Sequence, residues 1–167
     1  MRKIPNHALE VISKLILNEN ENIRRLITES LRPSSTLKWL RDPSKNDRIL
    51  ELLTLRNKDP SIYVRKSVGN NLKDLSKYMP QKVLRLLKDW IENSNIKVQD
   101  DLVSEIGLTR DQKRLIWTIK HALRWLQKKN PEYYPQIEKI LGKHYILYFD
   151  EKRNIFAKPF ENDSNLN

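Results

Sequence analysis

The sequence predicts an all-α protein in which antiparallel helix pairs stack side by side as an α-solenoid. Apolar residues recur at helical spacing in successive segments up to Gly142. The 167 residues include only three glycines, so few tight turns between strands are available. Hydrophobic residues make up 38% and charged residues 32% of the chain, a balance typical of thin helical layers with two solvent-facing sides.

Proline and short polar runs separate the expected helices. Pro33 ends the second helix, Ser44 is expected to cap the third, and Pro60 precedes the fourth. Thr109 and Gln112 form the pattern of a capping box for the helix that follows them. We expect helices over residues 6–17, 21–32, 62–78, 81–92, 113–129 and 131–141, a helix that begins after Ser44 and has its inward apolar residues between 49 and 55, and a weaker helix over 95–106.

A short motif repeats along the chain. Ile23-Arg24-Arg25 recurs 41 residues later as Val64-Arg65-Lys66, and Ile119-Lys120-His121 resembles both. HEAT-type repeats, which are helix pairs, have periods of roughly 40–47 residues. Each repeat would contribute one outer and one inner helix, and stacking would bury the face that a single pair leaves exposed. We therefore expect residues 1–142 to form a HEAT-like repeat domain.

The C-terminal residues 143–167 differ in character and are expected to form a separate tail. Residues 144–149 and 155–160 are rich in aromatic and apolar side chains and flank a polar run, which is the pattern of a short β-hairpin. The last residues, 161–167, are polar and are expected to be disordered.

The charge of the chain favours a polyanionic partner. Lys and Arg number 32 against 21 Asp and Glu, which gives a net charge of +11 and a pI near 9.8. A membrane-surface helix is the competing interpretation, but each helix needs its apolar stripe for packing. The chain has no cysteine, its three histidines lack ligand spacing, and no apolar run is long enough to span a membrane. We expect a soluble, cytoplasmic monomer without metal or cofactor.

Each repeat presents a polar row on its inner helix, beside the apolar stripe that packs. The apolar stripes are Val64, Val68, Leu72 and Leu75, and Leu115, Ile116, Ile119, Leu123 and Leu126. The polar rows are Arg25, Glu29 and Arg32, then Lys66, Asn70, Lys73, Asp74 and Lys77, then Trp117, His121, Arg124 and Lys128. Equivalent helices of a curved stack line its concave side, so the rows would form a groove for a nucleic-acid backbone. The alternative is that they are simply solvated faces.

Asp74 and Glu29 are acids within these basic rows. Asp74 could merely pair with Lys73 or Lys77, an interaction of about 0.3–0.5 kcal/mol on a helix surface. Alternatively, the neighbouring cations keep Asp74 ionised, so that it stabilises a cationic transition state at a sugar carbon. Gly69, within the same helix, would either permit close approach of another segment or reflect relaxed constraint.

Three segments resemble the bacterial alkylpurine DNA glycosylases of the AlkC/AlkD type, and AlkC most closely. Residues 23–33, Ile-Arg-Arg-Leu-Ile-Thr-Glu-Ser-Leu-Arg-Pro, are similar to a family run with Arg-Arg-Leu and Arg-Pro. Residues 59–77, from Asp-Pro-Ser-Ile-Tyr-Val-Arg to Leu-Lys-Asp-Leu-Ser-Lys, resemble the most recognisable family stretch. Residues 117–124, Trp-Thr-Ile-Lys-His-Ala-Leu-Arg, resemble the helix that holds the DNA backbone. Family members carry further helices before the region matched by the start of this chain.

The resemblance implies a HEAT-like fold and metal-free hydrolysis of the N-glycosidic bond of cationic N-methylated bases. It assigns the catalytic carboxylate to Asp74, and our hypothesis adds Glu29 as a supporting acid. Trp39 is the nearby candidate for packing on the damaged nucleotide, and a core tryptophan is the alternative. The residues expected to hold DNA are Arg25, Arg32, Arg65, Lys66, Asn70, Lys73, Lys77, Trp117, Lys120, His121, Arg124 and Lys128.

Two other functions remain open from the sequence. A non-catalytic HEAT-repeat module would keep the basic groove without a lesion pocket. A scaffold for acidic protein partners would use the same surface without a preference for DNA. Competition by duplex DNA would separate the scaffold from the other two.

Overall fold

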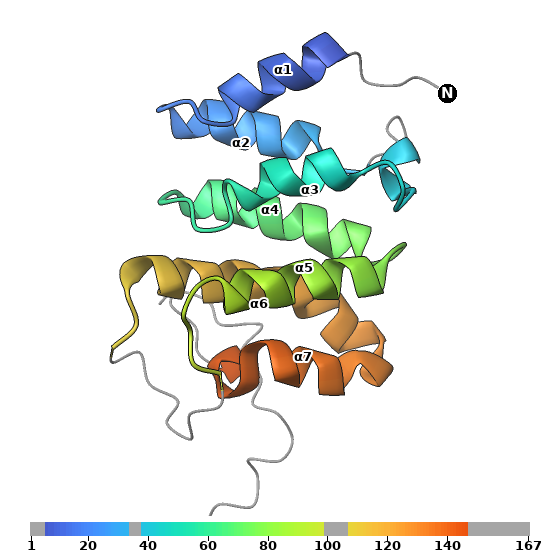
Figure 1. The fold of residues 1–167 in the computed structure, drawn as a ribbon, viewed down its shortest axis with the longest axis vertical. Coiled ribbons are helices and arrows are strands. Elements are labelled where there is room, and N and C mark those ends of the chain that lie inside the picture. Colours follow the sequence, from blue (N-terminus) through green and yellow to red (C-terminus); the bar gives the residue numbers. More distant parts are fainter. Residues whose placement is uncertain (1–5, 34–37, 99–106, 147–167) are drawn as a thin grey trace, which may run out of the picture.

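The structure, a computed structural model, describes residues 6–33, 38–98 and 107–146, and helices are the regular secondary structure in these ranges (Figure 1). These residues contain no strand, so the predicted all-α fold class is confirmed. The α-helices are α1 (Asn6–Leu15), α2 (Glu21–Ser30), α3 (Asp47–Thr54), α4 (Ile62–Leu75), α5 (Pro80–Glu92), α6 (Arg110–Lys129) and α7 (Tyr134–Leu141). Short 3-10 helices cover Lys38–Arg41 (η1), Pro131–Tyr133 (η2) and Gly142–Ile146 (η3).

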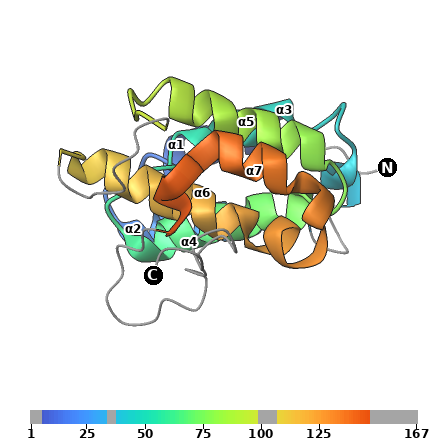
Figure 2. The ribbon, with the colours of Figure 1, turned by 90° about the horizontal axis from the view of Figure 1, so that it is seen from below.

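The helices are stacked along the long axis of the molecule in two layers. The inner layer consists of α2, α4 and α6, in which α4 packs against both of the others. The outer layer contains α1, α3 and α5, and α7 packs against α5 and α6 at the end opposite α1 (Figure 1). Figure 2 shows α3 and α5 along one side of the molecule and α2 and α4 along the other.

The core lies between these layers and follows the predicted apolar stripes. Every member of the two stripes on α4 and α6 is buried, with at most 3% of its surface exposed. Burial of each such aliphatic side chain contributes about 1.5–3 kcal/mol. Trp90 of α5 is also buried, and its indole N–H donates to the hydroxyl of Thr54 at 3.0 Å.

The repeated motif has a common structural role at its first two occurrences. Nη1 of Arg24 donates to the backbone carbonyls of Asn18 and Glu19 at 2.9 and 2.7 Å. Nη1 of Arg65 donates in the same way to the carbonyls six and five residues before it, at 2.6 and 3.0 Å. Each arginine therefore satisfies carbonyls in the turn that leads into its own inner helix.

A buried ion pair joins α2 to the turn before α4. Arg24 binds the Asp59 carboxylate through two parallel hydrogen bonds of 2.7 and 2.8 Å, and both side chains are buried. The backbone N–H of Ser61 donates to the same carboxylate at 2.9 Å. Burial raises the pKa of Asp59, but the hydrogen bonds from Arg24 and Ser61 outweigh it, so the pKa is lowered overall.

The helix starts agree in part with the sequence analysis. Thr109 and Gln112 form the expected capping box at the start of α6. The predicted cap at Ser44 is wrong, because its hydroxyl donates to Asp42 at 2.7 Å and α3 begins after Asn46. The predicted helix over 95–106 is absent at residues 95–98, where Asn95 has a positive φ of 57°, and the rest of it lies outside the described residues.

The first expected strand of the C-terminal tail is wrong where the structure describes it. Residues 144–146 belong to η3, and Tyr145 is fully buried in the core. Its hydroxyl donates to Gln127, and the ammonium of Lys120 lies 5.4 Å from the centre of its ring. Tyr145 of this segment therefore packs against α6 instead of forming part of a strand. Residues 147–167, with the rest of the hairpin and the expected disorder, lie outside the described residues.

Candidate nucleic-acid interface

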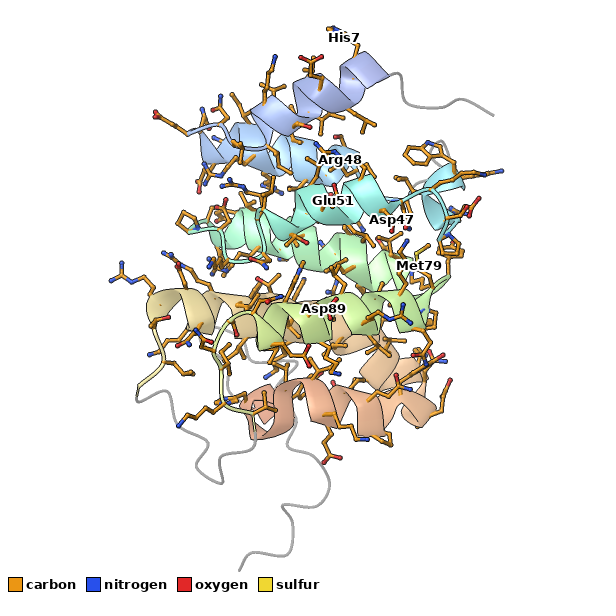
Figure 3. The ribbon with its side chains drawn as sticks, viewed as in Figure 1. His7, Asp47, Arg48, Glu51, Met79 and Asp89 are labelled. Carbon is orange, nitrogen blue, oxygen red and sulfur yellow. The ribbon has the colours of Figure 1, made fainter. Side chains whose placement is uncertain are left out.

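The charge of the protein is concentrated in the inner layer. Helices α2, α4 and α6 together contain twelve Lys and Arg residues against four Asp and Glu, a net charge of +8. Helices α1, α3 and α5 contain five of each sign, and Figure 3 shows Asp47, Glu51 and Asp89 on α3 and α5. A polyanion would therefore be attracted to the inner layer.

Ion pairs and hydrogen bonds connect the surface side chains of the inner layer. Arg32, which follows α2, contacts Asp74 of α4, and Asn70 of α4 contacts Arg124 of α6. We call this surface the basic face. Its fully or partly exposed members are Arg25, Glu29, Arg32, Lys66, Asn70, Lys73, Asp74, Lys77, Arg124 and Lys128.

Asp74 is surrounded by three cations on this face. The distances to its carboxylate oxygens are 2.6 Å from Nη2 of Arg32, 2.6 Å from Nζ of Lys73 and 3.4 Å from Nζ of Lys77. Burial of the carboxyl raises its pKa, but the hydrogen bonds from Lys73 and Arg32 outweigh this effect and lower the pKa overall. Asp74 is therefore ionised at neutral pH.

Glu29 shares a cation with Asp74. Nη1 of Arg32 lies 3.1 Å from a Glu29 oxygen, while Nε and Nη2 of the same guanidinium bind Asp74 at 3.2 and 2.6 Å. The structure therefore brings the two predicted acids together around one arginine. Glu29 therefore helps to fix the position of the Arg32 guanidinium, which also binds Asp74.

Four of the residues expected to hold DNA are buried instead. Arg65, Trp117, Lys120 and His121 expose between 2% and 9% of their surfaces. The guanidinium of Arg65 lies 5.4 Å from the centre of the Trp117 ring, and Trp117 stacks on His121 with their centres 4.9 Å apart. These side chains pack between helices, so the direct phosphate contact expected of them is not available in this arrangement.

Trp39 is partly buried and packs against the core from η1, which is the alternative that the sequence left open. Tyr78, an aromatic side chain that is 48% exposed, was not among the predicted site residues and follows the end of α4, four residues after Asp74. The guanidinium of Arg41 stacks over the Tyr78 ring at 4.9 Å from its centre. The spacing of four residues from Asp74 was the available signal.

Gly69 permits α4 and α6 to approach closely, which supports the first of its two interpretations. A Cβ at Gly69 would lie 2.7 Å from Cδ2 and 3.1 Å from Cβ of His121. The second distance matters because the root of a side chain cannot move without the helix that carries it. The contact is therefore specific to glycine at this position.

Gly69→Ala is expected to destabilise the protein, although alanine is the better helix former. The gain in helix propensity is about 1 kcal/mol, whereas overpacking of a tight contact costs about 1–3 kcal/mol. Urea unfolding should show a net loss of about 1 kcal/mol. Gly107→Ala serves as a comparison for backbone strain alone, since Gly107 has a φ of 85° and no atom near the site of its Cβ. A stabilised Gly69→Ala variant would contradict the close contact.

The comparisons with known proteins identify one informative relative. The chain is 35% identical over 119 residues to a Bacillus subtilis (strain 168) protein named "Uncharacterized protein YhaZ". The alignment covers 67% of this chain and 27% of that protein, so the chain spans about a quarter of its length. No family model matches the chain, and no solved structure matches it.

The described residues offer neither a membrane-spanning helix nor a cluster of metal-binding side chains. Among residues 6–33, 38–98 and 107–146, none of the helices has the length and apolar character needed to cross a membrane. In the same ranges, no group of three or more His, Cys, Asp or Glu side chains is placed to hold a metal ion.

Proposed function

We propose that the protein binds duplex DNA through the basic face and hydrolyses the N-glycosidic bond of cationic N-methylated bases. The observation that carries the proposal is the position of Asp74, an ionised carboxylate that contacts three cations of the basic face. The cations would bind phosphates, and the carboxylate would lie among them, close to the sugars that the phosphates connect.

The DNA-binding part of the proposal follows from the charge of the inner layer. Exposed Arg25 lies on α2, Lys66 on α4 and Lys128 on α6, and exposed Lys77 follows the end of α4. If the face neutralises about six phosphates, the logarithm of the affinity should fall with the logarithm of salt concentration with a slope of roughly −5. Binding measured between 50 and 200 mM salt would give this slope.

The catalytic part follows from the charge of the substrate. A cationic N-methylated base leaves as a neutral molecule, so it needs no proton from an acid. The bond between C1′ and the base nitrogen breaks with the electron pair going to nitrogen, and C1′ develops positive charge. Asp74 would stabilise that charge without accepting a proton. Water would then add to C1′ and lose one proton to solvent.

A second candidate function is DNA binding without catalysis. It is favoured by the two distances of 2.6 Å that Asp74 makes to Arg32 and Lys73. A carboxylate bound this closely by two cations has part of its charge already neutralised, which reduces its effect on a transition state. In this case Asp74 would organise the cations for phosphate binding.

Release of free base from methylated duplex DNA distinguishes the two candidates. The purified chain is incubated at low salt with duplex containing N-methylated purines, and the released bases are separated and quantified. Release above the spontaneous rate supports the glycosylase. Salt-sensitive binding without release supports the binding module, and absence of binding contradicts both.

A further inference from the structure

A chain of polar side chains crosses the contact between α4 and α6 and ends at Arg124. Oδ1 of Asn70 accepts a hydrogen bond from Nη2 of Arg124 and lies 3.2 Å from Nε2 of His121. Nη1 of Arg124 donates to the backbone carbonyl of His121. The guanidinium is therefore held from both helices, while part of the Arg124 side chain stays at the surface.

The hydrogen bonds define the proton arrangement of this cluster. Arginine only donates, so the Asn70 atom that it contacts is the amide oxygen, which only accepts. Burial, with the nearby charges of Arg124, Lys66 and Lys73, lowers the pKa of His121 to about 3, so its ring is neutral at pH 7. A neutral imidazole has one N–H, and the contact with Asn70 assigns it to Nε2.

Packing holds the His121 ring in place. Trp117 stacks on it with an angle of 8° between the two planes, and Gly69 adjoins its Cδ2 edge. Arg124 itself is less buried, and although burial lowers its pKa to about 10, the guanidinium stays protonated at pH 7. Asp74 lies close enough to interact with it electrostatically, one helical turn after Asn70 on α4.

We infer that Asn70 and His121 are positioning residues, which orient the Arg124 guanidinium to bind a backbone phosphate next to Asp74. They contribute to DNA binding through Arg124 and do not themselves contact the nucleic acid. This inference rests on the proposed DNA-binding function, and it changes the role assigned to two of the predicted DNA-binding residues.

A double-mutant cycle tests this inference with an unmodified, fluorescently labelled duplex. Arg124→Ala should weaken binding about tenfold, the size of one charge-assisted hydrogen bond, and lower the salt slope by about one. Asn70→Ala should have a similar effect, and the double variant should bind no more weakly than Arg124→Ala. Arg85→Ala, which removes an exposed arginine from α5 in the outer layer, should leave affinity nearly unchanged.

Substitutions of His121 separate positioning from a general structural role. His121→Gln retains a donor at the equivalent place and should keep near-wild-type affinity, whereas His121→Leu should match Arg124→Ala. Thermal unfolding of each variant establishes that it is folded at the binding temperature. Nitrogen-15 spectra of the histidine rings provide a readout independent of DNA, and they should show the proton of His121 on Nε2 at pH 7.

The outcomes are distinguishable from failure of the proposed function. Wild-type binding with additive effects of Asn70→Ala and Arg124→Ala overturns the positioning role alone. Equal losses for His121→Gln and His121→Leu also overturn it. A His121 proton on Nδ1 contradicts the hydrogen-bond geometry whether or not DNA binds. Absence of wild-type binding contradicts the proposed function, and the inference about phosphate binding fails with it.

Discussion

Asp74→Asn is expected to abolish base release while DNA affinity stays the same or increases slightly. The substitution keeps the size of the side chain but removes the negative charge that would stabilise the cationic sugar. It also removes an anion from a face that binds phosphates, so affinity should not fall. The first-order rate of base release should drop by at least a hundredfold, about 2.7 kcal/mol in activation free energy.

The matched control is Asp89→Asn. Asp89 is an exposed aspartate on α5 of the outer layer, away from the basic face (Figure 3). This variant changes the net charge of the protein by the same amount and should retain full base release. If Asp74→Asn binds DNA clearly more weakly than Asp89→Asn does, Asp74 has a structural role in holding Arg32 and Lys73. Retained release by Asp74→Asn would rule out its catalytic role.

Asp59→Asn is expected to cause the largest loss of stability, about 3–5 kcal/mol. It leaves the guanidinium of Arg24 with only 8% of its side chain exposed and no opposite charge at the position of Asp59. An asparagine can still accept one hydrogen bond, but it cannot balance the charge or offer two equivalent oxygens. Urea unfolding monitored by circular dichroism would measure the change.

Glu92→Gln is the control for Asp59→Asn. Glu92 pairs with Lys88 at 3.3 Å on the surface of α5, where both side chains are more than half exposed. Loss of such a pair typically costs less than 1 kcal/mol, because water and salt screen it. If the two variants lost similar amounts of stability, the buried pair would not have the role that its geometry indicates.

The fold and the core were largely predictable because they depend on local periodicity. The stripes on α4 and α6 point inward because their spacing of three and four residues matches the helix. The three-residue motif also identified equivalent positions, since Arg24 and Arg65 occupy the same place in their turns. What the motif could not reveal is that these positions are buried and bind carbonyls.

The candidate site was less predictable because burial depends on neighbours that are distant in sequence. Trp117 and His121 continue the polar row of α6 by spacing, yet α4 covers them across the contact at Gly69. Tyr145 shows the same limitation, because an aromatic-rich run predicts a strand equally well whether or not a helix lies beneath it. Only the pairing of Asp74 with Lys73 and Lys77 follows from local spacing, whereas Arg32 reaches Asp74 from the end of α2.

Asp59 binds arginines from two different helices, α2 and α4. Its carboxylate receives Arg24 from the first inner helix, and its backbone carbonyl receives Arg65 from the second. Opening of α1 and α2 would therefore remove the two hydrogen bonds from Arg24 and leave the buried carboxylate with only Nη1 of Arg56, at 3.3 Å, as its cation. Such a penalty discourages separate opening of α1 and α2, so the amides of α2 and α4 should become exposed in one cooperative opening. The segment that unfolds as one unit would then include α4 as well as α1 and α2.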